Sequence, residues 1–157
     1  MEHITWMLES KGVPSERLQV ELTESAVMAD TARAAETLRG VHASGVKVAI
    51  DDFGTGYFSL AFLRKFPVSE LKIDKSFVIG MSGNGEEDTV IVRSTNELGH
   101  NLGLNVVAEG VEDERTLELL STFGCDAAQG YFIARPMPAA DLTVWLRESR
   151  WAAPRTV

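Results

Sequence analysis

Residues 48–57 read Val48-Ala49-Ile50-Asp51-Asp52-Phe53-Gly54-Thr55-Gly56-Tyr57, so three apolar residues lead directly into two adjacent carboxylates and a loop with two glycines. The apolar run predicts a strand that is covered on both faces, as the strands of parallel sheets are. Aspartate is unfavourable in strands, and residues that break a local rule often mark a functional site. Because neighbouring strand residues point to opposite faces, both carboxylates can reach one site only where the strand ends. The stretch therefore predicts either an acidic site at a strand end or an aspartate pair that caps the following helix.

Outward from this stretch, strands and helices are expected to alternate along the whole chain. Apolar runs predict strands over residues 18–22, 46–51, 71–74, 104–109 and 127–132. The spacing of apolar residues, with glycine and proline stops, predicts helices over residues 2–11, 31–43, 87–102, 113–122 and 140–148. Residues 77–85, which end in a glycine-rich segment, are expected to form a connection. This alternation predicts a parallel sheet of right-handed βα units in one domain over residues 1–157, with an ordered core over 2–148 and a frayed tail over 150–157.

Composition excludes several classes of function. The chain has 157 residues, of which 45% are hydrophobic and 24% charged, as is ordinary for a soluble domain. Its net charge of −8 provides no basic field for a nucleic acid polymer or an anionic membrane. Cys125 is the only cysteine, so no intrachain disulfide can form, and residues 1–10 contain too short an apolar run for a signal peptide or a membrane span. We therefore expect a cytoplasmic protein, in which His3, His42 and His100 are surface or capping residues.

The predicted strands share one feature, which is that each ends in polar or charged residues. These residues are Glu21, then Asp51 and Asp52, then Lys72 and Asp74, then Glu109, and finally Gln129. In βα folds the carboxyl ends of the strands line the site. Carboxylates that converge there repel one another unless a cation neutralises them, and oxygen ligands favour Mg²⁺ or Mn²⁺. Two such ions, about 3.5–4 Å apart, can polarise a phosphoryl oxygen and activate water, which Lys72 could orient, so the pattern predicts a metal-dependent phosphoester hydrolase.

Five segments resemble, in order and spacing, the motifs of the EAL-domain phosphodiesterases. They are Glu21-Leu22-Thr23-Glu24, Asp51-Asp52-Phe53-Gly54-Thr55-Gly56-Tyr57, Leu71-Lys72-Ile73-Asp74, Val107-Ala108-Glu109-Gly110-Val111-Glu112 and Gln129-Gly130-Tyr131. The resemblance covers nearly the whole chain. It implies a (β/α)₈ barrel that uses Mg²⁺ or Mn²⁺ to hydrolyse one phosphodiester bond of cyclic di-GMP, giving linear pGpG.

The resemblance also implies roles for the matching residues. The positions that match metal ligands of the family are Glu21, Asp51, Asp52 and Glu109. Lys72 matches the lysine that holds the nucleophilic water, and Gln129 matches a glutamine near that water. Together with Glu109, these two residues form the catalytic set that the resemblance implies.

Three further acidic residues have supporting or alternative roles. Glu24 matches a glutamate that braces the Asp-Phe-Gly loop. Glu112 closes the Glu-Gly-Val-Glu motif, where it binds substrate, supports the site or simply begins the next helix. Asp74 either serves the site or forms a salt bridge. The loop at residues 53–59 matches a dimer contact of the family.

The Glu-Ala-Leu tripeptide itself does not occur in this sequence. In the family that motif lies on an early strand, and a later strand brings an asparagine ligand. Since such a barrel needs at least about 200 residues, we expect a truncated domain, a partial TIM-like barrel of about five βα units that correspond to strands four to eight. Open barrel edges predict a homodimer or a complementing chain, which would dock at these edges and at loop 53–59. Alone the chain is expected to be weakly active or inactive, and the alternative is a non-catalytic module that binds cyclic di-GMP or a partner protein.

Overall fold

The computed structural model describes residues 2–23, 31–56, 63, 66–83 and 85–152 of the chain. Its strands are β1 (Gln19–Thr23), β2 (Lys47–Phe53), β3 (Glu70–Ile73), β4 (Asn105–Glu109) and β5 (Ala127–Gln129). Its helices are α1 (Glu2–Lys11), the short 3₁₀ helix η1 (Ser15–Arg17), α3 (Thr31–Ala43), α5 (Lys75–Gly80), α6 (Glu86–Asn101), α7 (Glu114–Thr122) and α8 (Ala139–Glu148). No helix within these described ranges has both the length and the apolarity needed to cross a membrane.

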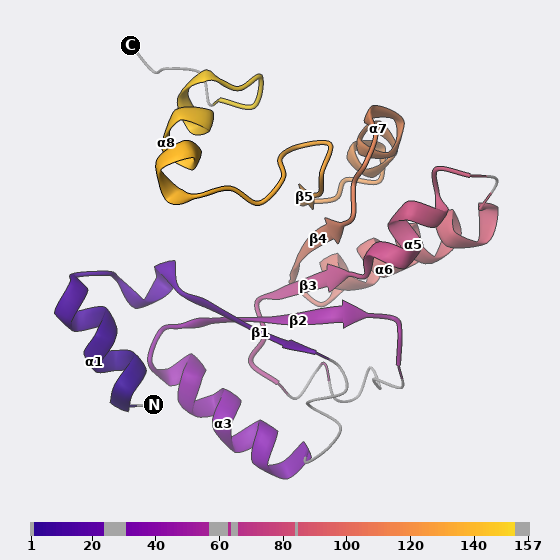
Figure 1. The fold of residues 1–157 in the computed structure, drawn as a ribbon. Coiled ribbons are helices and arrows are strands. Elements are labelled where there is room, and N and C mark those ends of the chain that lie inside the picture. The colour runs from indigo at the N-terminus through magenta and orange to yellow at the C-terminus, as the bar shows by residue number, and fades with distance from the viewer. Residues whose placement is uncertain (1, 24–30, 57–62, 64–65, 84, 153–157) are drawn as a thin grey trace.

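All five strands lie parallel in one sheet, in the order β1-β2-β3-β4-β5. Each strand pairs with the next strand of the sequence, so that Ile50 of β2 lies between Leu22 of β1 and Leu71 of β3. Because βα crossovers are right-handed, a strand order that never reverses keeps the connecting helices on one face of the sheet. A doubly wound sheet, whose order reverses, would carry helices on both faces. The topology is that of a barrel wall, with β1 and β5 at its two ends (Figure 1).

The hydrophobic core lies between the sheet and its helices. Helix α3 packs on β2, and α6 packs on β3 and β4. The fully buried helical side chains include Leu38 of α3, Val92 of α6 and Leu120 of α7. In β2, residues 48–50 are all at most 1% exposed, so this strand is covered on both faces, as its apolar run predicted.

The predicted alternation of strands and helices is confirmed, but one predicted connection is a helix. Residues 75–80 form α5 immediately after β3. Asp74 caps this helix, because its carboxylate accepts a hydrogen bond from the backbone N–H of Ser76 at 2.9 Å. The capping residue and the helix begin at the carboxyl end of β3, so α5 borders the polar rim.

Two predicted strand ends also differ from the structure. Strand β2 does not stop at Asp51 but continues to Phe53. Strand β5 ends at Gln129 rather than at Phe132, because the chain turns there: the Gly130 carbonyl accepts hydrogen bonds from the N–H groups of Ile133 and Ala134, both at 3.1 Å.

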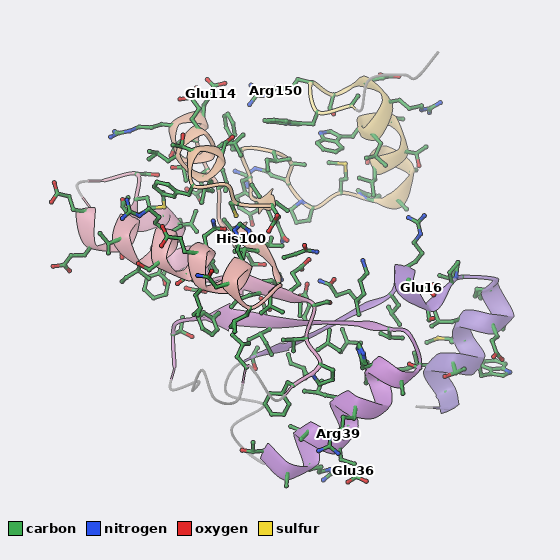
Figure 2. All side chains as sticks on the ribbon, turned by 180° about the vertical axis from the view of Figure 1, so that it is seen from behind. Glu16, Glu36, Arg39, His100, Glu114 and Arg150 are labelled. Carbon is green, nitrogen blue, oxygen red and sulfur yellow. The ribbon has the colours of Figure 1, made fainter. Side chains whose placement is uncertain are left out.

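The two terminal helices are the least covered elements. Helix α8 has no buried residue, and none of the side chains over residues 3–11 of α1 is buried. The segment that directly follows α8 nevertheless has contacts, whereas residues 153–157 of the tail expected to fray lie outside the described residues. The Arg150 guanidinium lies 4.5 Å from the ring centres of Phe132 and Trp151 and reaches toward Glu114 of α7 (Figure 2). These contacts tie the end of α8 to the segments that follow β4 and β5.

Candidate functional site

Lys72 of β3 lies at the centre of the polar rim. Its Nζ atom is 2.9 Å from Glu21 Oε1, 3.1 Å from Asp51 Oδ1 and 2.7 Å from Glu109 Oε1. These carboxylates come from β1, β2 and β4, so one ammonium group bridges four neighbouring strands. The side chain is buried, which by itself would lower the pKa of Lys72, but the contacts with Glu109, Glu21 and Asp51 outweigh burial and raise that pKa well above its usual range. Lys72 is therefore a permanent cation of the site.

Strand β2 brings both of its aspartates to this rim through a local irregularity. Its pairing with β3 shifts register between Ile50 and Phe53. Asp52 has a φ of 55°, in the left-handed region that aspartate tolerates better than most residues. Oxygen atoms of Asp51, Asp52 and Glu109 consequently lie within 4.8 Å of one another. Both carboxylates thus reach the rim near the end of β2, where the pairing is irregular and the strand stops one residue later, at Phe53.

Asp74 links the acidic residues to α5. Its carboxylate accepts hydrogen bonds from the backbone N–H and the hydroxyl of Ser76, and it interacts with the neighbouring carboxyl group of Asp52. Burial, followed by the charges of Asp51 and Asp74, raises the pKa of Asp52. Burial also opposes the charge of Asp74, but the bonds from Ser76 and Asp52 prevail and lower its pKa. The two neighbouring carboxyl groups therefore differ, with the pKa of Asp52 shifted up and that of Asp74 shifted down.

The acidic residues are chemically suited to hold a divalent cation. Asp51, Asp52 and Glu109 offer three carboxylate oxygens, the hard ligands that Mg²⁺ and Mn²⁺ prefer. Asp51 Oδ1 is buried and accepts no hydrogen bond from the described residues; Lys72 approaches it as an ion-pair partner only. A buried carboxylate oxygen without a hydrogen bond is a good position for a metal ligand.

The loops after β4 and β5 meet beside this acidic group. The N–H of Val111 donates to the Gln129 carbonyl at 3.1 Å, and the N–H of Phe132 donates to the Val111 carbonyl at 3.0 Å. A Cβ atom on Gly130 would collide with the main chain of Val111, so only glycine permits this approach. Gly110, with a φ of 75°, similarly allows Lys75 of α5 to lie close to the loop.

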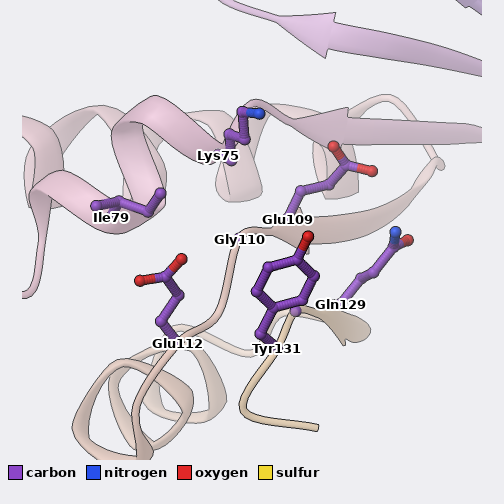
Figure 3. A pocket seen from close by; sticks show the side chains of 8 residues that line it. Lys75, Ile79, Glu109, Gly110, Glu112, Gln129 and Tyr131 are labelled. Atoms are coloured by element: carbon purple, nitrogen blue, oxygen red, sulfur yellow. The ribbon is translucent and has the colours of Figure 1, made fainter. Parts of the chain in front are cut away.

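These loops and α5 enclose a cavity of about 280 Å³ next to Glu109. Figure 3 shows Glu112, Tyr131 and Gln129 along one side of it and Lys75 and Glu109 along the other. The Tyr131 side chain is 56% exposed, and the guanidinium of Arg135 lies 4.4 Å from its ring centre. An exposed aromatic ring beside carboxylate and amide groups is suited to a flat, hydrogen-bonding ligand.

The structure gathers most residues that the sequence predicted for the site. Glu21, Asp51 and Glu109 surround Lys72, and Gln129 lines the cavity beside Glu109. Glu112 also lines this cavity and does not begin α7, since Asp113 caps that helix by accepting a hydrogen bond from the Thr116 N–H at 2.8 Å. Glu24 and residues 57–59 of the predicted dimer loop lie outside the described residues.

Tyr131 and Lys75 were not predicted as site residues. A signal for Tyr131 was available, because an aromatic residue directly after the glycine that follows Gln129 sits at a strand end. For Lys75 no local signal existed, since its position depends on the contact between α5 and Gly110.

The wall of parallel strands with an acidic rim defines a βα-barrel type of domain with a candidate metal site. The family model described as the EAL domain matches residues 1–136, and this chain therefore belongs to the EAL-domain family.

Individual relatives agree with this assignment. The chain is 45% identical over 125 residues to the bifunctional diguanylate cyclase/cyclic di-GMP phosphodiesterase MucR of Pseudomonas aeruginosa, a match that covers 80% of this chain and 18% of MucR. The solved MucR phosphodiesterase in complex with cyclic di-GMP has a TM-score of 0.85 at 40% identity, covering 90% of this chain and 57% of that one. A manganese and cyclic di-GMP complex of Klebsiella pneumoniae BlrP1 has a TM-score of 0.80 at 30% identity, covering 86% and 34%. The chain thus spans less than a fifth of MucR and about a third of the BlrP1 chain.

Proposed function

We propose that this chain carries the greater part of the active site of a cyclic di-GMP phosphodiesterase, which uses Mg²⁺ or Mn²⁺ to open one phosphodiester bond and release linear pGpG. The observation that carries the proposal is the convergence of Glu21, Asp51 and Glu109 on Lys72, with Asp52 within reach of the same oxygens. The cyclic di-GMP complex of MucR and the manganese complex of BlrP1 support it, because they align with 90% and 86% of this chain.

Four carboxylates would hold the ions. Asp51, Asp52 and Glu109 form the group that can share one cation, and the half-exposed Glu21, which also pairs with Lys72, would contribute to a second position. Bound divalent ions would supply Lewis-acid polarisation of the scissile phosphoryl group and a more acidic water. The carboxylate form of Asp52 is the strong ligand, so a bound cation would oppose the upward shift of its pKa.

Two side chains that are not acidic, those of Lys72 and Gln129, would contact the attacking water or the phosphoryl group. The ammonium of Lys72 lies at the centre of the carboxylates and could donate hydrogen bonds to the attacking water or to a phosphoryl oxygen. The amide of Gln129, which is paired with Glu109 of β4 at the end of β5, could orient the same water. Asp74 would act through Asp52, and Glu24 would brace the Asp-Phe-Gly loop.

The cavity beside Glu109 would receive one guanine base of the substrate. The Tyr131 ring offers a stacking surface, and stacking on aromatic side chains is a common way to hold an unpaired base. The carboxylate of Glu112 can accept hydrogen bonds from the N–H groups on the Watson–Crick edge of guanine. Recognition of the base next to Glu109 would place the attached phosphodiester over the carboxylates.

A partner would complete the barrel. The outer edges of β1 and β5 have no strand neighbour among the described residues, and parallel strands are normally buried. We propose that a second copy or a complementing chain covers these edges, and that the loop at residues 53–59 contributes to a dimer contact.

Turnover of cyclic di-GMP with Mn²⁺ tests the catalytic proposal, with chromatographic separation of pGpG. Glu109→Gln should reduce turnover by about 100-fold or more, because it removes a ligand charge and a partner of Lys72. Glu97→Gln removes the same charge from the exposed face of α6, where the ion-pair partner of Glu97 among the described residues is Arg93 at 3.7 Å, and should leave turnover unchanged. Equal effects of the two substitutions would contradict the proposed site.

Calorimetry with cyclic di-GMP distinguishes the alternative function, binding without catalysis, from the proposed phosphodiesterase activity. Binding without turnover, in a folded sample that also binds Mn²⁺, would identify a non-catalytic module that recognises cyclic di-GMP. The open sheet edges are the observation that favours this alternative, since the described strands form only part of a barrel.

A further inference from the structure

Lys72 occupies a position that a metal ion would be expected to fill. Its ammonium group lies 2.7–3.1 Å from three carboxylate oxygens that come from three different strands. Lys72 is 5% exposed, whereas the side chains of Glu109, Asp51 and Glu21 are 17%, 21% and 47% exposed, so the ammonium neutralises the carboxylates from their buried side. A buried cation among several carboxylates removes the repulsion that would otherwise push them apart.

The partners of Lys72 overlap with the candidate metal ligands. Asp51 and Glu109 belong both to the ion pairs of Lys72 and to the group of three carboxylates that can share a cation. The same two carboxylates can therefore pair with either of two cations, the ammonium of Lys72 or a bound divalent ion. Like charges a few ångströms apart repel strongly where solvent is excluded, so the ammonium and a divalent ion disfavour each other at this position.

We propose that Lys72 is the resident counter-cation of the acidic rim, and that a divalent ion must displace its ammonium from Asp51 and Glu109. This inference rests on the metal site of the proposed function. In the metal-free protein Lys72 keeps the carboxylates assembled, and its charge lowers the affinity of the rim for metal. Displacement frees the Lys72 hydrogen-bond donors, so the lysine becomes available to water and phosphate only when metal is bound.

The experiment compares Mn²⁺ binding to the wild-type chain and to Lys72→Met, with free Mn²⁺ measured by electron paramagnetic resonance. Methionine keeps an unbranched side chain of similar length and removes the charge. The affinity for Mn²⁺ should rise by about tenfold or more in this variant. With EDTA its melting temperature should fall below that of the wild type, and Mn²⁺ should raise it by a larger amount than in the wild type.

Lys47→Met is the matched control for a general change in net charge. Lys47 is exposed at the opposite end of β2 and has no ion pair with the carboxylates of the rim among the described contacts. Its substitution should change the affinity for Mn²⁺ by less than about threefold.

A measurement on the wild-type chain keeps the inference testable if Lys72→Met does not fold. The ε-methylene groups of ¹³C-labelled lysines are followed by NMR during titration with Mg²⁺, with the Lys72 signal assigned through Lys72→Arg. The Lys72 signal should shift as metal binds, whereas the signal of exposed Lys47, at the opposite end of β2, should remain in place.

An unchanged or weaker affinity for Mn²⁺ in Lys72→Met, or a Lys72 signal that does not respond to saturating Mg²⁺, would overturn the inference. If the wild-type chain still turns over cyclic di-GMP, the proposed function stands without it. Absence of Mn²⁺ binding in both the wild type and Lys72→Met would overturn both the inference and the proposed metal site.

Discussion

At the scale of single residues, Gly130 decides how the loops after β4 and β5 meet. The main chain of Val111 occupies the space that a Cβ would need, and main-chain atoms cannot move aside as a flexible side chain can. Gly130→Ala should therefore destabilise the protein by about 2 kcal/mol or more. Gly103→Ala is the control, since Gly103 has a φ of 74° but open space around it, and should cost only about 1 kcal/mol of backbone strain. Urea unfolding measures the loss in the free energy of unfolding for each variant. An equal loss in both would mean that the main chain of Val111 moves away from residue 130 at little cost.

At the scale of elements, Asp126 ties α6, β4 and β5 together at the end of the sheet opposite the rim. Its Oδ2 atom accepts a hydrogen bond from the Val106 N–H at 2.7 Å and lies 2.9 Å from His100 Nε2. The Val106 N–H, followed by His100, lowers the pKa of Asp126. His100 thus has a defined partner, which its expected role as a surface or capping residue did not include.

This contact gives a pH-dependent prediction. Asp126→Asn should lower the free energy of unfolding at pH 7 by about 1 kcal/mol, a small value because the site is partly exposed. A carboxylate whose folded pKa is depressed stabilises the fold fully above its unfolded pKa, near about 3.9, and loses this effect as pH falls through the folded value. The stability difference between wild type and variant should therefore shrink as the solution is acidified below pH 4. Glu118→Gln, on the exposed side of α7, should show no such difference at either pH.

At the scale of the whole molecule, the ends of the sheet and the terminal helices are left incompletely covered. Leu142, Val144 and Leu146 of α8 are 41–56% exposed, and β5 has one unpaired edge among the described residues. Such edges and apolar faces favour association. Sedimentation should therefore detect a concentration-dependent dimer or larger assembly.

Matched substitutions on α8 test whether this helix takes part. Leu146→Lys should weaken the association by about tenfold, because it removes apolar contact area, whereas Thr143→Lys adds the same charge at an exposed polar position and should have little effect. A well-folded wild-type chain that sediments as a monomer at all concentrations would contradict the proposed partner.

Much of the candidate site could be predicted because its residues are marked locally. Apolar runs predict strands wherever they occur, and a carboxylate or lysine directly after such a run is placed at the rim by strand direction alone. Glu21, Asp51, Lys72, Glu109 and Gln129 were found in this way. The helix α5 was missed because Asp74 was considered as a site residue and not as the cap that begins a helix.

By itself the sequence determined the order of strands and helices, the polar rim at the strand ends and the family of the chain, since each of these depends on short stretches and their spacing. Only the tertiary structure decided that Asp52 turns toward Asp51, that Lys72 is shared by three carboxylates, and that Gly130 must admit the main chain of Val111. These features depend on register and on contacts between segments far apart in the chain. Local apolar spacing does not encode such contacts, because many three-dimensional placements are compatible with the same pattern along the sequence.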